Sequence, residues 1–404
     1  MPSSVNSCSN SDVESDTSTL VYDHESFTTY QSRILEFALE NVWPDAAAEN
    51  IILERLQGGG FNRIIGITRQ KDDQADPTEV QYILRLPRFD AAQVDSDVAI
   101  LCFLEQHTQM PTPKVIAFDD TDCNRLESPY MIQHRIKGVD TLSTFPSLDH
   151  SARLKFAREM GNVFREMLGT QSSMAGTLTF SVKDKSLLTP FHITPFAPQD
   201  PQQAVPYHNS ATNQTVLELL TANFKAQTAF ELKHYPDDVL TPHMMERFCA
   251  MALELDADGW FENVHNCLAH LDLAPRNILV DSVSNTQSPI ISAVLDWDSA
   301  VFAPMFMACT PPLWIWDWQE DEEEDERKAN DDPSSPEARQ LKRVFEKSAG
   351  PEYTRFAYEP AYRLARRLVR FAVDGRIGSS EDTRQAKEML EEWAIIHKER
   401  HCSH

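Results

Sequence analysis

The sequence predicts an α+β fold in which strands dominate the first third of the chain and helices the remainder. Short apolar runs bounded by turn residues, such as 80–87, occur up to about residue 135. Beyond that point apolar residues recur at helical spacing, as in 148–168. The 404 residues, 41% of them hydrophobic, are enough for two or three domains with a substantial core.

The elements follow in order along the chain. Strands are expected on both sides of a glycine run at 58–60, and then at 80–87, 111–118, 129–138 and 289–295. A helix is expected at 96–104, and further helices at 148–168, 215–235, 242–268, 360–373 and 381–399. Residues 169–215, rich in Ser, Thr, Pro and Gln, predict an irregular insertion that is either a lid or a disordered connector. The arginines of 360–373 are interpreted as the solvated face of an amphipathic helix: Arg363, Arg366, Arg367 and Arg370.

Composition excludes several classes of function. The formal charge of −25 argues against nucleic acid or an anionic membrane as a partner, because both require a basic surface. No apolar run is long enough for a membrane span. Residues 1–21 are acidic and Ser-rich, which predicts a disordered tail rather than a targeting segment.

The seven cysteines are scattered and indicate neither a disulfide framework nor a zinc site, so a reducing cytoplasm is expected. The oligomeric state stays open.

The chemistry-bearing motif is His270-x-Asp272-x-x-x-x-Asn277, followed at once by an apolar run. This is the spacing of a kinase catalytic loop, in which the Asp accepts the proton of an attacking hydroxyl and the Asn holds a magnesium ion. The three-point match is weak alone. A single Asp before a turn is more often a cap, and His270 is more simply a buried imidazole that orients the loop.

A second acidic motif follows about twenty residues later. The strand expected at 289–295 ends in Asp296-Trp297-Asp298, and an acidic residue leaving a strand there can reach the same metal ion. Oxygen side chains that bracket an apolar hairpin suit Mg²⁺. Asp298 is either a second carboxylate ligand or a surface turn residue.

The catalytic-loop spacing, the Ile-Leu-Val-Asp strand after it and the Leu-Asp-Trp-Asp segment resemble the aminoglycoside phosphotransferase family, and within it most closely a large fungal set. The family is the small-molecule branch of the protein-kinase-like fold and includes choline kinases. The resemblance implies two lobes, a mainly β small lobe at 22–135 and a mainly α large lobe at 136–400. It also implies ATP and Mg²⁺, with Asp272 and His270 as catalytic residues and Asn277 and Asp296 as metal ligands.

The resemblance places the nucleotide-binding residues upstream. Gly58, Gly59 and Gly60 would form the loop over the phosphates, although a triple glycine is also an ordinary hairpin turn. Gly59, Gly60 and Asn62 match the family's Gly-Gly-x-x-Asn segment with one residue fewer. The hinge that binds adenine would lie at 133–136, and its residues are Gln133, His134 and Arg135.

A cation and an acid complete the predicted nucleotide site. Arg85 stands where kinases carry a phosphate-binding Lys, and Asp97, on the following helix, stands where the family usually has Glu. The simpler alternatives are a surface cation on an edge strand for Arg85 and a solvated first-turn acid for Asp97.

The segment after the metal motif is aromatic and then acidic. Glu320 to Glu326 is an unbroken run of seven acids within a predicted acidic loop at 319–332. The family places its acceptor pocket near this segment, so Trp314 and Asp317 could contact a cationic amine on the acceptor. The simpler interpretation is a solvated loop that the tryptophans anchor to the large lobe.

The resulting hypothesis is transfer of the γ-phosphoryl group of ATP, with Mg²⁺, to a hydroxyl of a small molecule. Activity on proteins is disfavoured because no Ala-Pro-Glu motif follows Asp296 at activation-segment distance. The rival is a catalytically silent binding or scaffold protein on the same fold. The changes at Arg85 and Asp97 and the shortened glycine segment support the rival, and the intact Asp272, Asn277 and Asp296 set opposes it.

Overall fold

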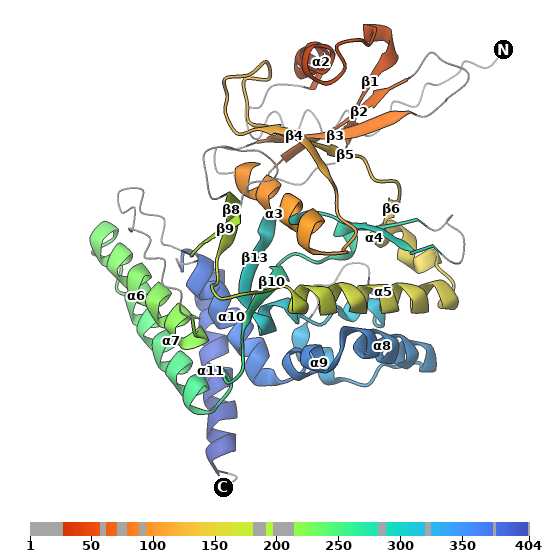
Figure 1. Ribbon diagram of the computed structural model, residues 1–404. Coiled ribbons are helices and arrows are strands. Elements are labelled where there is room, and N and C mark those ends of the chain that lie inside the picture. The colour runs from red at the N-terminus through yellow and green to blue at the C-terminus, as the bar shows by residue number, and fades with distance from the viewer. Residues whose placement is uncertain are drawn as a thin grey trace, which may run out of the picture. The chain divides into compact units, whose positions relative to one another are not determined.

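The computed structural model describes residues 27–56, 62–70, 79–88, 94–180, 191–196, 214–281, 288–319, 325–374 and 377–402. The chain divides into two compact units, the first comprising 1–102 and 113–136 and the second 103–112 and 137–404. A sheet dominates the first unit and helices dominate the second (Figure 1). The predicted α+β fold, with a mainly β part followed by a mainly α part, is therefore confirmed. The predicted tail at 1–21 lies outside the described residues.

The first unit is built on a five-stranded antiparallel sheet in the order β1-β2-β3-β5-β4. The bounds are Ile51–Leu56 for β1, Asn62–Arg69 for β2, Val80–Pro87 for β3, Val115–Asp119 for β4 and Tyr130–His134 for β5. The strand predicted at 80–87 is confirmed as the middle strand. The two predicted at 111–118 and 129–138 exist but are shorter.

Helix α2 (Phe27–Phe37) supplies most of the core on one side of this sheet. Its buried residues Tyr30, Ile34 and Phe37 recur at the spacing of one helical face. They pack in one cluster with β-strand residues such as Ile67 and Leu84, both fully buried. The next helix, α3 (Val94–His107), starts in the first unit and carries Asp97 in its first turn.

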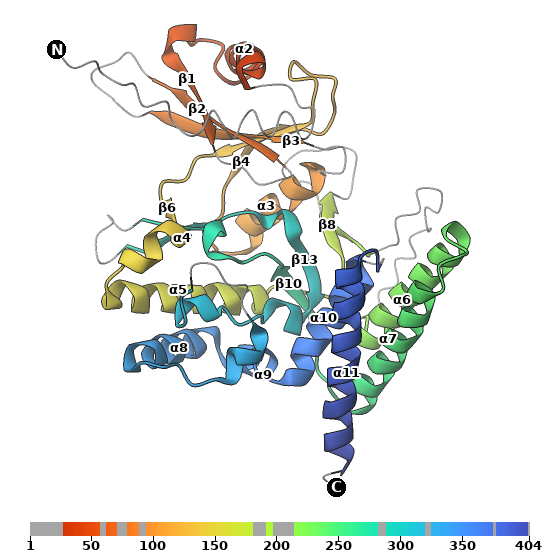
Figure 2. The ribbon, with the colours of Figure 1, turned by 180° about the vertical axis from the view of Figure 1, so that it is seen from behind.

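The second unit is mainly helical. Its helices are α4 (Thr141–Thr144), α5 (His150–Gly169), α6 (Val216–His234), α7 (Leu240–Ala257), α8 (Pro336–Ala349), α9 (Pro351–Ala357), α10 (Pro360–Asp374) and α11 (Ser380–Cys402). Figures 1 and 2 show α5 beside α8, and α6, α7 and α11 grouped together. The close approach of α5 to α8 requires Gly161, where a Cβ would lie 2.6 Å from the carbonyl oxygen of Phe345. The helices predicted at 148–168, 215–235, 360–373 and 381–399 are confirmed.

The helix predicted at 242–268 is wrong in its second half. α7 ends at Ala257, and Gly259 then takes a φ of +80°, a left-handed conformation that stops the helix. Residues Asn266–His270 instead form β10, all of whose residues are buried.

Three small sheets hold the loops of the second unit. One has the order β13-β10-β7 (Ala300–Pro304, Asn266–His270, Gln171–Ser172), and another β12-β11-β6 (Ile291–Val294, Ile278–Val280, Val139–Asp140). β8 (Thr177–Phe180) and β9 (Phe191–Thr194) pair as a hairpin. The insertion predicted as irregular at 169–215 therefore contains three strands, while its parts at 181–190 and 197–213 lie outside the described residues.

The arginines of α10 correct another prediction. Arg363 and Arg366 are not on a solvated face but are buried. Arg366 Nη2 lies 2.7 Å from Glu326 Oε2, and Arg363 pairs with Glu392. Glu326 belongs to the acid run that was predicted to be a solvated loop, so the end of that run is anchored to the core; 320–324 lie outside the described residues.

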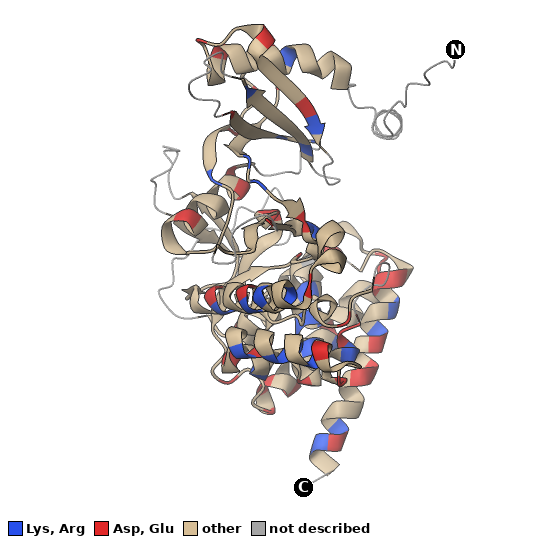
Figure 3. Cartoon of the chain, turned by 90° about the vertical axis from the view of Figure 1, so that its right-hand side faces the viewer, with Lys and Arg blue, Asp and Glu red and all other residues tan. Residues whose placement is uncertain are grey.

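Charged residues are distributed rather than segregated in the view of Figure 3, where acidic and basic positions are interleaved along the helices of the second unit. Within the part of the chain that the structure describes, no helix is both long and apolar enough to cross a membrane.

Candidate functional site

The catalytic-loop motif connects two strands of different sheets in the second unit. β10 ends at His270, a short 3-10 turn covers Pro275–Asn277, and β11 starts at Ile278. Because both strands are almost entirely buried, the ends of the loop are fixed by the core while Asp272 between them is only half-buried. The loop is thus a partly exposed segment on a rigid base, as positioning of a reacting group requires.

His270 is the buried support of this loop. Its Nδ1 accepts a hydrogen bond from the backbone N–H of Asp272 (3.2 Å), so Nε2 carries the ring proton and donates it to the carbonyl oxygen of Leu295 (2.9 Å). Burial lowers the pKa of His270, which favours this neutral form. With both nitrogens engaged, His270 is suited to hold the loop, which favours the orienting role over proton transfer.

Asp272 is held from three directions. Asn277 Nδ2 donates to its backbone oxygen (2.8 Å) and to Oδ2 (3.1 Å), and the N–H of Ala274 donates to the same backbone oxygen (2.9 Å). Arg276 Nη2 contacts both carboxylate oxygens, at 2.6 and 2.7 Å. Sequence reasoning missed Arg276, although its position four residues after Asp272 is the spacing at which opposite charges meet on one turn.

Asp296 follows Leu295, a residue that is hydrogen-bonded to the catalytic loop. β11 and β12 pair with Ile278 opposite Val294, and the next residue, Leu295, donates its N–H to the carbonyl oxygen of Asn277 (2.7 Å). The carbonyl oxygen of Leu295 accepts from His270. The structure therefore ties the predicted His270 and Asn277 to Leu295, the residue that precedes Asp296.

The backbone of Asp296 is left-handed, with φ 63° and ψ 47°. Non-glycine residues rarely take this conformation, and it costs free energy that the surrounding structure must supply. Trp297 supplies part of it, because its buried ring donates through Nε1 to the carbonyl oxygen of Val294 (2.9 Å) and packs on the ring of His270. Asp296 and Asp298 are both exposed. The choice between ligand and turn residue for Asp298 stays open.

Two oxygen side chains here fit a hard cation. Since Asn277 Nδ2 is directed at Asp272, Oδ1 is the atom left to face a ligand. Asp296, which is exposed, lies just after the adjoining strand β12. One or two such oxygens are the protein ligands that Mg²⁺ takes when phosphates and water complete its octahedron.

The predicted nucleotide residues lie in the first unit. Arg85 is buried in the middle strand β3, opposite Ile64 on one side and Met131 on the other, so it is not a surface cation on an edge strand. Asn62, also buried, begins β2. Asp97 is half-buried, and its pairing with Arg85 remains a prediction. Gly58, Gly59 and Gly60 lie outside the described residues.

The predicted hinge begins inside the sheet. Gln133 and His134 belong to β5, and the N–H of His134 donates to the carbonyl oxygen of Lys114 (2.9 Å). The N–H of Arg135 donates to the carbonyl oxygen of Gln81 (3.1 Å), and its side chain pairs with Glu54 (2.6 Å). Since these two N–H groups are engaged within the unit, hydrogen bonds to adenine would have to use other groups of 133–136.

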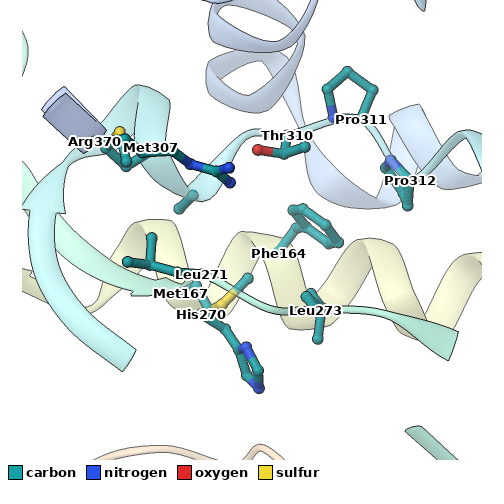
Figure 4. Close-up of a pocket in the computed structure, with 11 residues that line it drawn as sticks. Phe164, Met167, His270, Leu271, Leu273, Met307, Thr310, Pro311, Pro312 and Arg370 are labelled. Carbon is teal, nitrogen blue, oxygen red and sulfur yellow. The ribbon is translucent and has the colours of Figure 1, made fainter. Parts of the chain in front are cut away.

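A small pocket lies against the catalytic loop in the second unit (Figure 4). Its volume is about 70 Å³, which admits a few atoms and no whole substrate. Leu271 and Leu273 flank Asp272 and line it, together with Phe164 and Met167 of α5. The guanidinium of Arg370 and the hydroxyl of Thr310 reach towards it from other elements, and the ring of His270 points away (Figure 4).

The segment predicted to contact the acceptor is only partly open. Trp314 is 5% exposed and packs its ring against Phe145 and Phe156, at centroid distances of 5.7 and 5.6 Å. Its side chain is therefore part of the core, which argues against the predicted aromatic cage for a cation. Asp317 is exposed and accepts a hydrogen bond from Gln319 (3.4 Å).

Comparison with known proteins gives one family match and a set of similar structures. The model of the phosphotransferase enzyme family matches residues 69–341. Aminoglycoside phosphotransferase APH(4)-Ia is 17% identical over 90% of this chain and 98% of that one, with a TM-score of 0.48. ADP-bound APH(2'')-Ib is 15% identical over 88% of this chain and 96% of that one, with a TM-score of 0.49. No curated protein sequence matches the chain.

Proposed function

The chain belongs to the phosphotransferase enzyme family, and we propose that it transfers the γ-phosphoryl group of ATP to a hydroxyl of a small molecule in the presence of Mg²⁺. One observation supports this most strongly. Leu295 is hydrogen-bonded to both Asn277 and His270, so the residue that precedes Asp296 is tied to the loop that carries Asp272. A base and two oxygen ligands in one rigid unit suit phosphoryl transfer.

Asp272 is the proposed base. Asn277 and the backbone N–H of Ala274 fix its main chain, so the carboxylate is presented in one orientation to an acceptor hydroxyl and accepts its proton. Arg276 occupies both carboxylate oxygens in this structure. An acceptor hydroxyl must share or displace that contact, and the guanidinium then lies close to the transferring phosphoryl group, where positive charge is favourable.

Asn277 and Asp296 are the proposed Mg²⁺ ligands. The ion would bridge nucleotide phosphates and neutralise charge that develops on them. In the first unit Arg85, with Asp97 as its proposed partner, would hold phosphate oxygens, and the segment Gly58–Gly60 would cover them.

The acceptor is proposed as a hydroxylated small molecule without a required positive charge, because the burial of Trp314 removes the cage on which a cationic acceptor was based. Of the two residues predicted to contact the acceptor, Asp317 remains a candidate. A reducing cytoplasm is part of the proposal, and the six free cysteines among the described residues favour it.

The test is release of ADP from ATP–Mg²⁺ by the purified chain, screened against a panel of hydroxylated metabolites. The parent should turn over with at least one acceptor, and Asp272→Ala should lower turnover by about a hundredfold or more, with nucleotide affinity nearly unchanged. Arg276→Gln should lower it by about tenfold, because a favourable charge is lost while the base remains.

The controls separate catalysis from binding. Asp317→Asn, in an exposed residue away from the loop, should change the acceptor KM at most. Equal activity of Asp272→Ala and the parent contradicts the assignment of the base. ATP binding by a parent that turns over no acceptor supports the alternative of a silent kinase-like protein.

A further inference from the structure

A cluster of two imidazoles and one carboxylate lies where the last turns of α11 meet the end of α7. His397 Nδ1 is 3.0 Å from Asp258 Oδ2, and His401 Nε2 is 3.0 Å from Asp258 Oδ1. One ligand atom from each of the three side chains lies within 4.8 Å of the other two. None of these residues belongs to the proposed catalytic site.

The local structure explains why the three side chains converge. His397 and His401 are four residues apart on α11, so both project from one face of the helix. Asp258 caps α7: its N–H donates to the carbonyl oxygen of Glu254 (2.9 Å), and Gly259 turns the chain away with a φ of +80°. The carboxylate is thereby directed at α11, with only 4% of its side chain exposed.

Two further contacts fix the spacing of the helices at this point. Trp393 Nε1 donates to Glu254 Oε2 (2.6 Å) one turn before His397, and Arg400 Nη2 donates to the carbonyl oxygen of Asp258 (2.9 Å). Figures 1 and 2 show α11 running beside α7 towards the C-terminal end. The positions of the three ligand atoms are therefore set by the framework around them.

We propose that Asp258, His397 and His401 bind one divalent transition-metal ion of the zinc type. Two imidazole nitrogens and a carboxylate oxygen are the ligands that Zn²⁺ takes with three protein residues, and water completes the tetrahedron. His401, with 58% of its side chain exposed, leaves an entry path for the ion and room for the water.

The ion replaces hydrogen bonds that the cluster makes without it. Each imidazole now shares a proton with one oxygen of the same carboxylate. When a divalent cation enters, each imidazole binds it as a neutral ligand through the nitrogen that faces Asp258. A ring that starts neutral then carries its proton on the other nitrogen, and a ring that starts protonated releases one proton to solvent. The ion then links the last turns of α11 to the end of α7, which makes its expected role structural.

The test uses the full chain without a histidine tag, stripped of metal by a chelator and titrated with Co²⁺ as a spectroscopic substitute for Zn²⁺. The parent should bind one equivalent with the visible absorption of tetrahedral Co²⁺, and Zn²⁺ should displace it. Zn²⁺ should also raise the Tm by at least about 2 °C, because it binds the native state selectively.

Three variants and a control decide whether this site is responsible. Asp258→Asn, His397→Gln and His401→Gln should each weaken Co²⁺ binding by about tenfold or more. His150→Gln, in a histidine that hydrogen-bonds to Gln340 and is not part of the cluster, should bind Co²⁺ like the parent. His401→Gln is decisive if the other two misfold, because His401 is the most exposed of the three.

Absence of a stoichiometric tetrahedral complex in the parent overturns the proposal. Parent-like binding by His401→Gln does so as well, and so does an equal loss in His150→Gln. Because the readouts are metal binding and Tm, these outcomes are independent of whether the chain transfers phosphate.

Discussion

The imidazole of His270 connects the two halves of the proposed site through its two nitrogens. One accepts from the backbone of Asp272 and the other donates to the carbonyl oxygen of Leu295, the residue before Asp296. A protonated ring could not accept from Asp272, so the arrangement depends on the neutral form. The integrity of the site should therefore depend on pH through this residue.

The first prediction concerns that dependence. Burial lowers the pKa of His270 in the folded protein, whereas an unfolded histidine titrates near about 6.5. As the pH falls below that value the unfolded chain takes up a proton that the native state excludes, so stability declines until the folded-state pKa is reached. This one group contributes at most about 1.4 kcal/mol per pH unit.

Urea unfolding of the parent and of His270→Asn between about pH 7.5 and 5.5 measures this contribution. The other histidines are common to both proteins, so they cancel in the comparison. The variant should be less stable at the upper pH and should lose less stability on acidification. Parallel profiles would show that His270 does not titrate on unfolding.

At this scale the sequence supplies residue types and their spacing, but not their backbone conformations. The spacing of His270, Asp272 and Asn277 was the basis for predicting the loop. In the structure, His270 and Asn277 both hydrogen-bond to the backbone of Asp272. The left-handed backbone of Asp296 left no signal, since it arises from packing of Trp297 in the folded core. The ion pair between Arg276 and Asp272 could have been predicted from their separation of four residues.

Among the elements, α10 shows where helical periodicity fails as a guide. The pattern assigns its arginines to the polar face but does not tell what covers that face. Arg366 donates to Glu326 and to the carbonyl oxygens of Phe306 and Phe356. Glu326 and Phe306 come from segments distant in sequence, so part of the polar face of this helix proved to be internal.

The second prediction follows from this burial. Arg366→Ala leaves the carboxylate of Glu326 without its cation and removes the guanidinium donor from the carbonyl oxygens of Phe306 and Phe356, so it should cost about 3–5 kcal/mol of unfolding free energy. Arg370→Ala, in an exposed residue on the same helix, should change it by less than about 0.5 kcal/mol. Chemical denaturation of both variants provides the measurement. If both variants lowered the unfolding free energy by similarly small amounts, Arg366 would have to be solvent-exposed rather than buried.

The helix predicted at 242–268 illustrates the other limit at this scale. A short segment with a few apolar residues, such as Asn266–His270, is compatible with a strand and with a helix. The segment becomes a strand because it pairs with β13 and β7. Those partners are distant in sequence, so the local sequence does not reveal the pairing. The proposed catalytic motif lies beside this error and does not depend on it, because its identification used spacing rather than secondary structure.

Across the whole molecule, the proposed nucleotide residues are divided between the two units. Arg85 and Asp97 belong to the first, and Asn277 and Asp296 to the second. The resemblance to a kinase-like fold implied two lobes, at 22–135 and 136–400, and it assigned these residues to them. The acceptor could not be predicted, since Trp314 is aromatic and near the motif in sequence but buried in the structure.

The third prediction separates the contributions of the two units to one nucleotide. Arg85 is proposed to hold phosphate oxygens directly, so Arg85→Ala should weaken ATP binding by about tenfold or more both with and without Mg²⁺. Asp296 is proposed to act only through the ion. Asp296→Asn should therefore abolish the gain in affinity that Mg²⁺ confers while leaving metal-free ATP binding as in the parent.

Calorimetric titration of ATP into the parent, Arg85→Ala and Asp296→Asn, each with and without Mg²⁺, gives the six affinities that this comparison needs. Asp298→Asn is the matched control, since Asp298 is also exposed and lies two residues away; a parent-like result makes it a turn residue, and loss of the Mg²⁺ effect makes it a second ligand. Equal weakening of metal-free binding by Asp296→Asn would mean that the residue supports the fold rather than the ion. Unchanged ATP binding by Arg85→Ala would show that another residue of the first unit contacts the phosphates. The proposed base and metal ligands of the second unit would not be affected by that result.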